Sequence, residues 1–481
     1  MSRASGWLAE ALRGQAAADP RRLLAACRAG LAVLDEHRFT LGASELRAQA
    51  TAHGAELAAL AQRHAAQAHR PRLLLAWAER WRATALAVPA VRPPADVELS
   101  TSLAALRRVT SEAQEARRTG EPPAALLREQ RRLENLVRSA TLRTRGNTGD
   151  ARATISITQL IQELGAVQLI EIVDIDGLLH VLTCRDGRVR QFAAGRTDAA
   201  TRAVGLAGFA LRRLARARPG ADPASALAIL DGTAPKLQDA LLGPAAAHLG
   251  DGPAVVVPPS RLHSIPWALL PALRDRVFSV APSAGAWLRA HTSAPPPGRT
   301  VTLARGPGLA TDGAEVPLIA PLYADVTMLS GGQATAAQVL AALDGAWLAH
   351  IAAHGSFRAD SPLFSSLRMH DGLLTGYDFE QLRRAPYRLV LPSCDSGVVA
   401  PAGADELLGL VSSLLPLGTA GVVASVAPLN DQATVPLMLD LHQRLSSGAT
   451  LAESLCGVRR WASADPVLLA AAWSLVALGA G

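Results

Sequence analysis

The chain has 481 residues, of which 49% are hydrophobic and 19% are charged. This balance excludes a disordered or fibrous protein and allows two to four domains with a large buried core. The formal net charge of +7 comes from residues 1–150, which hold 23 Arg against 15 Asp and Glu, a balance of +8. Because aromatic residues make up only 4% and no recognition motif is present, we do not expect a nucleic-acid partner. A nucleic-acid-responsive regulator stays an alternative if the basic helices form one continuous face.

Four cysteines are spread along the chain without a CxxC pair, which argues against a zinc site and a disulfide framework: Cys27, Cys184, Cys394 and Cys456. The first residues, MSRASGWLAEALRG, are amphipathic and lack the apolar region of a secretory signal. We therefore expect a cytoplasmic protein in which a free thiol can act as a nucleophile.

The longest uncharged run, residues 410–429, has nearly the length of a membrane span. Pro416, Gly418 and Gly421 interrupt it, so we expect a short buried helix, a turn and a buried strand, with no membrane contact. The run at 466–481 is expected to end in a strand that completes the fold.

Helical spacing of apolar residues dominates the N-terminal part. Residues 1–86 predict antiparallel helix pairs, residues 87–96 form a proline-rich break, and two long helices at 99–120 and 122–143 follow. The pairs resemble degenerate tetratricopeptide repeats, although no fixed period is legible and an unrelated helical bundle fits as well. We expect three parts: a helical, repeat-like region at 1–95, a helical hairpin linker at 96–150 and an α/β domain at 151–481, divided into 151–250 and 251–481.

After a loop at 145–154 the pattern changes to period two. Asp-Gly pairs at 176–177 and 186–187 separate strand-like runs, which predicts a small antiparallel meander. Helices are expected near 198–217 and 233–248.

From residue 254 onward short apolar strands alternate with helices, which predicts a mainly parallel sheet with helices on both faces. The expected strands are 254–259, 277–283, 300–307, 325–331, 346–355, 388–394 and 420–428, and the expected helices are 334–343, 377–384 and 405–417. In such sheets functional residues collect at the carboxyl ends of the strands. His354 and Cys394 each fall at such an end.

A histidine near a cysteine suggests nucleophilic catalysis, because a thiol attacks only as its thiolate and an imidazole can take its proton. Gly355 would let its backbone N–H approach a substrate carbonyl, and the N–H of Cys394 would complete an oxyanion hole. The alternative is two ordinary buried groups at strand ends. His350, four residues before His354, is interpreted as core packing.

Several motifs support the catalytic interpretation. The strings HIAAHGSFRADSPLFSSLRMHDGLLTGYDF, LVLPSCDSG, VVVPPSRLHSIPWALL and ARGPGL, with others between residues 150 and 481, resemble the CHAT family of caspase-like domains associated with tetratricopeptide repeats. The resemblance implies an α/β caspase-like sandwich, related to separases and caspases, behind an all-α N-terminal region. It assigns His354 as general base, Cys394 as nucleophile, and Gly355 with the backbone of Cys394 as the oxyanion hole. It implies no cofactor and no metal.

Substrate contacts are assigned less directly. The resemblance to separases places Asp431 in the pocket for the substrate's first side chain, where it would favour Arg or Lys. Asp431 is equally suited to cap a helix starting near residue 432, and we favour the cap. Asp395 and, less strongly, Asp360 are further candidates for substrate contact.

The sequence therefore predicts a regulated cysteine endopeptidase that cleaves protein substrates, with a regulatory protein partner at the helical N-terminal region. A catalytically silent caspase-like scaffold for protein interactions is the alternative.

Overall fold

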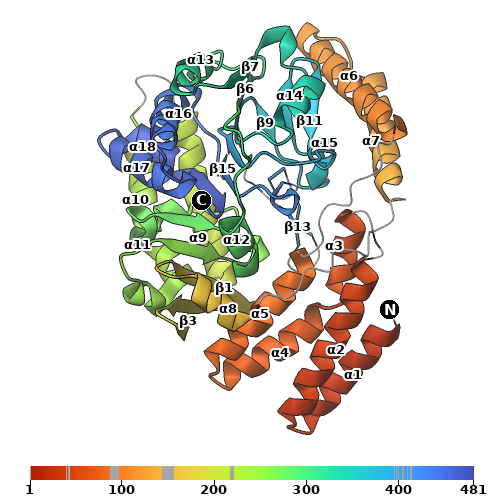
Figure 1. Ribbon diagram of the computed structural model, residues 1–481, viewed down its shortest axis with the longest axis vertical. Helices are drawn as coiled ribbons and strands as arrows, with labels where there is room; N and C mark the ends of the chain where they lie inside the picture. The colour runs from red at the N-terminus through yellow and green to blue at the C-terminus, as the bar shows by residue number, and fades with distance from the viewer. Residues whose placement is uncertain are drawn as a thin grey trace.

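The computed structural model describes all residues except 1, 40, 42–43, 87–96, 143–155, 217–221, 395, 397, 399, 403–405, 409 and 412–413. Figure 1 shows a group of helices at the N-terminal end lying against a larger α/β body. The break predicted at 87–96 and the loop predicted at 145–154 fall outside the described residues.

The N-terminal part is helical, as predicted. Its helices are α1 (Ser2–Ala16), α2 (Pro20–Phe39), α3 (Ser44–Ala52), α4 (Ala55–Gln67), α5 (Pro71–Leu86), α6 (Val97–Thr119) and α7 (Ala124–Leu142). Helices α1 and α2 pack as a pair around a core that includes Leu31, Leu34, Trp77 and Trp81. The long pair α6 and α7 turns at Gly120, whose φ of +80° favours glycine.

One large sheet organises the rest of the chain. Its strands, in spatial order, are β3 (Arg188–Arg196), β2 (Leu178–Arg185), β1 (Gln168–Ile175), β4 (Ala254–Val257), β5 (Phe278–Val280), β16 (Leu475–Gly479), β15 (Gly421–Ser425), β12 (Arg388–Leu391), β8 (Leu348–Ala352), β6 (Val301–Arg305) and β7 (Val326–Leu329). Neighbours are parallel except β3–β2, β2–β1 and β16–β15. The prediction of a mainly parallel sheet is confirmed.

The predicted meander is present but extends the main sheet, because β1 pairs in parallel with β4. Both Asp-Gly pairs form two-residue turns with positive φ at each residue: +53° and +79° at Asp176 and Gly177, and +49° and +71° at Asp186 and Gly187. This is the geometry that a tight hairpin requires.

Helices cover both faces of the sheet. The helices are α8 (Ile157–Glu163), α9 (Thr197–Ala215), α10 (Ala224–Leu242), α11 (Pro271–Arg274), α12 (Ala284–His291), α13 (Glu315–Ile319), α14 (Ala336–Leu343), α15 (Gly376–Phe379), α16 (Asp431–Ser446), α17 (Leu451–Ala462) and α18 (Pro466–Trp473). Along β12, Leu389 and Leu391 join the core under α9, α10 and α14, whereas Val390 joins the core under α13, α16 and α17. Alternate side chains of one strand thus enter opposite layers.

Two predicted helices need correction. The helix expected at 233–248 begins earlier, at Ala224, ends at Leu242 and contains Pro235. The helix expected at 405–417 is wrong: β14 (Glu406–Leu408) pairs with β13 (Ala400–Ala402), and the described residues after it include a 3₁₀ turn, Leu415–Leu417. The apolar run was too short and too interrupted by Gly and Pro to separate a helix from a strand by periodicity.

The predicted turn within residues 410–429 lies at Gly418, with φ +102°, and the predicted buried strand is β15. Among the described residues, no helix combines the length and the apolar character needed to cross a membrane.

Helix α5 connects the N-terminal helices to the sheet. Leu74 and Leu75 pack in a core with β1, β4 and α12. Both carboxylate oxygens of Glu79 accept backbone N–H groups at the start of α12, from Ala284 at 2.9 Å and Gly285 at 2.8 Å. Arg82 forms a buried ion pair with Glu171 of β1. Hydrophobic packing and buried polar contacts therefore hold α5 against the α/β body.

The α6–α7 pair docks on a second, small sheet formed by β9 (Gly355–Ser356), β10 (Ser366–Met369) and β11 (Gly372–Thr375) and on its flanks. Arg107 pairs with the buried Asp378 at 2.7 Å, and Glu134 pairs with Arg358 at 2.6 Å. Figure 1 shows α6 and α7 beside β11 and α15. The two helices thus brace the segment that follows His354.

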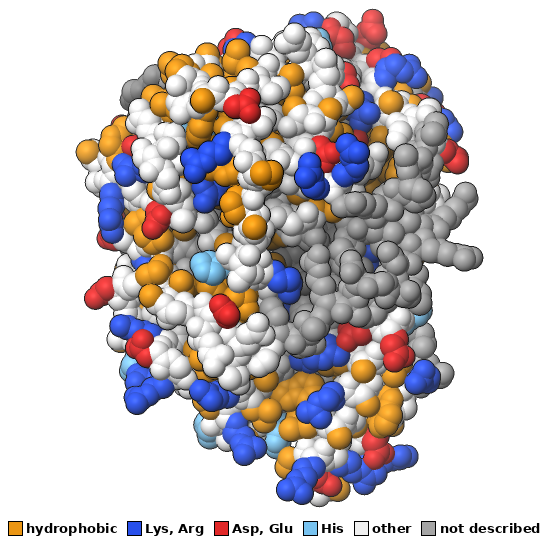
Figure 2. Space-filling view, viewed as in Figure 1, with side chains coloured by type: hydrophobic (Ala, Val, Ile, Leu, Met, Phe, Trp, Pro, Cys, Tyr) orange, Lys and Arg blue, Asp and Glu red, His pale blue; other side chains and the backbone are white. Residues whose placement is uncertain are grey.

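Charges are mixed on the surface. Figure 2 shows basic and acidic side chains interspersed over the visible face, including the N-terminal helices, outside its grey region. On this face the basic residues of the helices do not form the continuous surface that a nucleic-acid regulator requires.

Candidate active site

The register of the sheet brings the ends of β8 and β12 together. In this parallel pair Arg388 lies opposite Leu348 and Val390 opposite His350, an offset of 40 residues. The same offset separates His354 from Cys394, so the chain continues from both strands toward the same edge of the sheet. His354 is exposed and Cys394 is half-buried.

Gly355 lies directly against the backbone of Cys394. A Cβ atom at position 355 would lie 2.5 Å from the Cys394 carbonyl oxygen and 3.1 Å from the Cβ of Ser393. Real Cβ atoms essentially never approach a backbone atom so closely, so this contact requires glycine. The backbone is also fixed from the other side, where the Arg368 N–H donates to the His354 carbonyl at 2.9 Å.

The His354 ring is oriented by a backbone carbonyl. Its Nε2 lies 2.8 Å from the Gly308 oxygen, on the loop that follows β6. Because a carbonyl only accepts, Nε2 carries the proton and Nδ1 is left as the basic nitrogen. Gly308 has a φ of +79°, a conformation that favours glycine.

The Cys394 thiol lies on the side of the next strand, β15. Its Sγ is 3.9 Å from the Leu429 carbonyl oxygen, a weak S–H contact. The loop of Cys394 is held by Ser396, whose hydroxyl donates to the Leu391 oxygen at 2.8 Å and accepts the Ser425 N–H at 3.1 Å. Ser396 is a structural support that the sequence pattern did not single out.

Asp431 is not the helix cap. The cap of α16 is Asn430, whose side chain accepts the Ala433 N–H at 3.1 Å, and Asp431 is the first helical residue. Asn and Asp are equally good N-cap residues, so the sequence does not distinguish Asn430 from Asp431, and the prediction of Asp431 was wrong. The Asp431 carboxylate instead accepts the Ala310 N–H at 2.9 Å.

These contacts close a ring around the two strand ends. Cys394 touches Leu429, two residues before Asp431, and Asp431 holds Ala310, two residues after the Gly308 carbonyl that orients His354. The ring gathers His354, Gly355, Cys394 and Asp431.

The other two candidates are not part of this ring. Asp395 lies outside the described residues. Asp360 pairs with Arg358 at 2.7 Å.

His350 belongs to a buried polar chain beneath the site. Its Nδ1 lies 3.0 Å from Nε2 of His442, and His442 Nδ1 lies 2.9 Å from the Tyr323 hydroxyl. Burial lowers the pKa of His350 to about 3 and lowers the pKa of His442 well below its usual value, helped there by His350. Both imidazoles are therefore neutral in the folded protein.

We expect the buried histidines His350 and His442 to make the free energy of unfolding depend on pH. In the unfolded chain both histidines take up protons near their usual pKa of 6.5, whereas in the folded protein the pKa of His350 is lowered to about 3 and that of His442 lies well below 6.5. The free energy of unfolding should thus fall as pH drops below 6.5. Urea titrations at pH 6.0, 5.5 and 5.0 should show that the free energy of unfolding changes with pH less steeply in His442→Asn than in the wild type, by up to about 1.4 kcal/mol per pH unit. Equal slopes would contradict this origin.

The fold is that of separase-like, caspase-type proteins. Two crystal structures of the Saccharomyces cerevisiae separase–securin complex match with TM-scores of 0.56 and 0.54, each at 9% sequence identity. The match covers 96% of this chain and 37% of the separase chain, so this chain spans a little over a third of that protein.

The family is shown by sequence. The model of the CHAT domain matches residues 231–479, about half of the chain, and the chain belongs to the CHAT domain family. No curated protein matches it. The resemblance inferred from the motifs is confirmed.

Proposed function

We propose that the protein is a cysteine endopeptidase that uses His354 and Cys394 as its catalytic dyad. The observation that carries the proposal is the ring of contacts that gathers His354, Gly355, Cys394 and Asp431 at one edge of a caspase-like sheet. Membership in the CHAT family supports a peptidase, and the match to separase supports the fold.

The proposed reaction assigns each group one step. With Nε2 protonated and hydrogen-bonded to Gly308, Nδ1 of His354 takes the proton of the Cys394 thiol. The thiolate attacks the peptide carbonyl carbon, and the negative charge that forms on the carbonyl oxygen is stabilised by the N–H groups of Gly355 and Cys394. His354 then protonates the leaving amine, and water hydrolyses the thioester, which regenerates the thiol.

A basic side chain is the preferred first residue of the substrate under this proposal. Asp431 lies two residues after Leu429, whose carbonyl contacts the Cys394 thiol, and its negative charge also acts on Glu315 at the start of α13, whose pKa is raised first by burial and further by Asp431. Glu315 is 3% exposed, and its Oε2 has no hydrogen-bond partner among the described residues. Because burial favours the neutral form of Glu315, the proposed preference for Arg or Lys over an acidic residue rests on the Asp431 carboxylate.

The helical N-terminal region is the proposed binding site for a regulatory protein partner. The separase structures that match this chain contain securin, a protein partner of that enzyme. In this chain α7 holds Arg358, four residues after His354, through Glu134, so a partner on these helices is in a position to act on the site. We propose a cytoplasmic location, consistent with cysteines that are all unpaired.

A peptide probe tests the dyad and the pocket together. Acyloxymethyl ketones with Arg, Lys, Asp or Leu at the first position should label Cys394, fastest with Arg or Lys. The label should disappear in Cys394→Ala and drop strongly in His354→Ala. Asp431→Asn should reduce the preference for Arg and Lys over Leu.

The other cysteines are internal controls. Cys27, Cys184 and Cys456 are buried, and burial raises the pKa of the Cys27 and Cys184 thiols to about 11. If Cys394 reacts no faster than these three with any probe, the alternative of a silent scaffold for protein interactions replaces the peptidase.

Gly355→Ala should reduce peptide hydrolysis about 100-fold, because the added Cβ forces the Cys394 backbone away from its position. The effect should appear in kcat. Gly205→Ala is a matched control, since a Cβ there meets nothing within 4 Å. Equal activity of both variants would show that the close contact at Gly355 has no catalytic role.

A further inference from the structure

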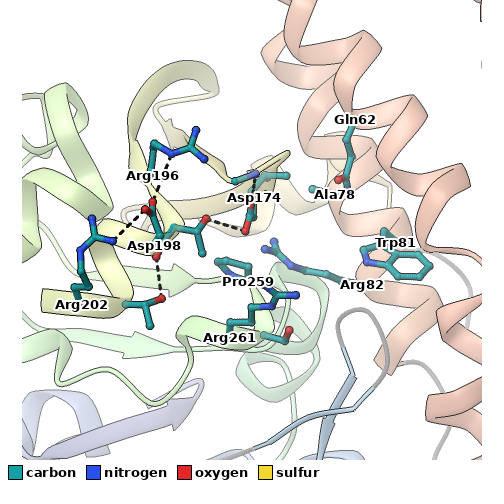
Figure 3. Close-up of a pocket in the computed structure, with 15 residues that line it drawn as sticks. Gln62, Ala78, Trp81, Arg82, Asp174, Arg196, Asp198, Arg202, Pro259 and Arg261 are labelled. Atoms are coloured by element: carbon teal, nitrogen blue, oxygen red, sulfur yellow. Dashed lines mark hydrogen bonds and ion pairs between the residues drawn. The ribbon is translucent and has the colours of Figure 1, made fainter. Parts of the chain in front are cut away.

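A cavity of about 860 Å³ lies between the N-terminal helices and the α/β body, away from the catalytic dyad. Helices α4 and α5 form one wall, through Gln62, Ala78, Trp81 and Arg82. The opposite wall comes from the end of β1, the start of α9 and the 3₁₀ turn Ser260–Leu262. Figure 3 shows Arg82 extending from α5 and Arg261 from the opposite wall into the space between them.

Positive charge is in excess in this cavity. Four arginines and two aspartates line it: Arg82, Arg196, Arg202, Arg261, Asp174 and Asp198. Asp174 is already used by the Gly177 N–H at 2.9 Å and the Thr197 hydroxyl at 2.8 Å.

The arginines differ in whether their guanidinium groups are already paired with a carboxylate. Arg196 and Arg202 share one carboxylate, Asp198, at 3.5 and 3.1 Å. Arg261 is exposed and has no hydrogen bond or ion pair with any described residue. A guanidinium group with unused N–H donors can bind a planar or tetrahedral oxyanion through two of them at once.

A side-chain amide also lines the cavity. Gln62 of α4 is only 7% exposed, and its side chain makes no hydrogen bond within the described part of the chain. An amide that lines a cavity can both donate to and accept from a polar group of a ligand. Figure 3 shows Gln62 on the wall opposite Asp174 and Arg196, above Arg82.

The shape favours a small molecule over a peptide. The volume is in the range of ligand pockets, roughly 300–1,000 Å³. A peptide would bind best by adding to a free strand edge, but β1 is paired on both sides, with β2 and β4.

We propose that this cavity binds a phosphate-bearing small molecule of nucleotide size, with Arg261, Arg202 and Arg196 contacting phosphate and Gln62 contacting its polar head. The cavity wall Ser260–Leu262 contacts β13, the strand that follows Cys394, and α5 contacts β14. A ligand here would therefore bind next to the segment that leaves the nucleophile.

Calorimetric titration of the full chain with pyrophosphate and with magnesium-free ATP tests the proposal without any need for peptidase activity. We expect saturable binding at a single site that weakens with salt. Arg261→Gln and Arg202→Gln should each weaken binding about tenfold, and Gln62→Leu should weaken ATP more than pyrophosphate. Arg131→Gln removes the same charge from α7 and should change nothing.

Three results would overturn it. The first is that neither probe saturates at millimolar concentration. The second is that Arg131→Gln weakens binding as much as Arg261→Gln. The third is that a polyglutamate peptide binds with the same arginine dependence while both phosphates do not bind. The second result would indicate a general attraction of phosphate to the positive charge of the protein. The third would indicate that the cavity binds an acidic protein segment and not a phosphate-bearing small molecule.

Discussion

Cys394→Ala and His354→Ala should each lower kcat/KM for peptide hydrolysis by about 10³-fold or more, with the fold intact. Cys394 supplies the only thiol at the ring of contacts formed by the described residues, and His354 supplies the base that its Gly308 hydrogen bond orients. The substrate is the peptide cut fastest by the wild type in a peptide-library digest. The double variant should be no worse than either single variant, because the two groups act as one unit.

Comparing peptide hydrolysis by Cys394→Ala and Cys456→Ala separates loss of the nucleophile from the general effect of removing a thiol. Cys456→Ala removes a buried thiol on α17 and should leave hydrolysis unchanged. Hydrolysis that survives in Cys394→Ala would assign the cleavage to another residue or to a contaminant. Unaltered melting temperatures in both dyad variants are expected, because His354 is exposed and the contact of the Cys394 thiol with the Leu429 carbonyl is weak.

Arg82→Met should destabilise the protein by about 3–5 kcal/mol, measured by urea unfolding at pH 7.5. Arg82 has a side chain that is 5% exposed and pairs with Glu171, which is fully buried. Its guanidinium also donates to the Ile172 carbonyl at 2.7 Å. Without Arg82 the fully buried Glu171 carboxyl group loses its cation, and burial already raises its pKa.

Two further variants identify the cause. Arg82→Met with Glu171→Leu should recover most of the loss, because a hydrophobic pair avoids the desolvation of two charges. Arg63→Met breaks the exposed pair with Asp176, at 2.8 Å, and should cost about 1 kcal/mol or less. A loss in Arg82→Met no larger than in Arg63→Met would show that α5 is held by its hydrophobic contacts alone.

The strands that carry the site could be predicted because each is a short apolar run bounded by turn residues. His354 and Cys394 each follow a predicted strand, so a parallel sheet places both at the same edge. The structure adds that the spacing between the two residues equals the register of β8 and β12. The Asp-Gly hairpins were equally clear, since few other pairs adopt two positive φ angles.

The contacts that orient the site were not predictable in the same way. The Gly308 carbonyl and the Ala310 N–H are backbone groups, which every residue has, so no residue type marks them. The strand Glu406–Leu408 was taken for a helix because its apolar residues fit either period. The buried pair of Arg82 and Glu171 joins residues 89 positions apart, and tertiary structure alone brings them together.

The most direct test of the dyad is the rate of Cys394 alkylation by iodoacetamide as a function of pH, read by mass spectrometry in the wild type and in His354→Ala. The proposal predicts that Cys394 of the wild type reacts rapidly at neutral pH, well below the usual thiol pKa of about 8.5. In His354→Ala the same reaction should require alkaline pH. Identical profiles with an ordinary thiol midpoint in both proteins would contradict the assignment of His354 and Cys394 as a catalytic pair.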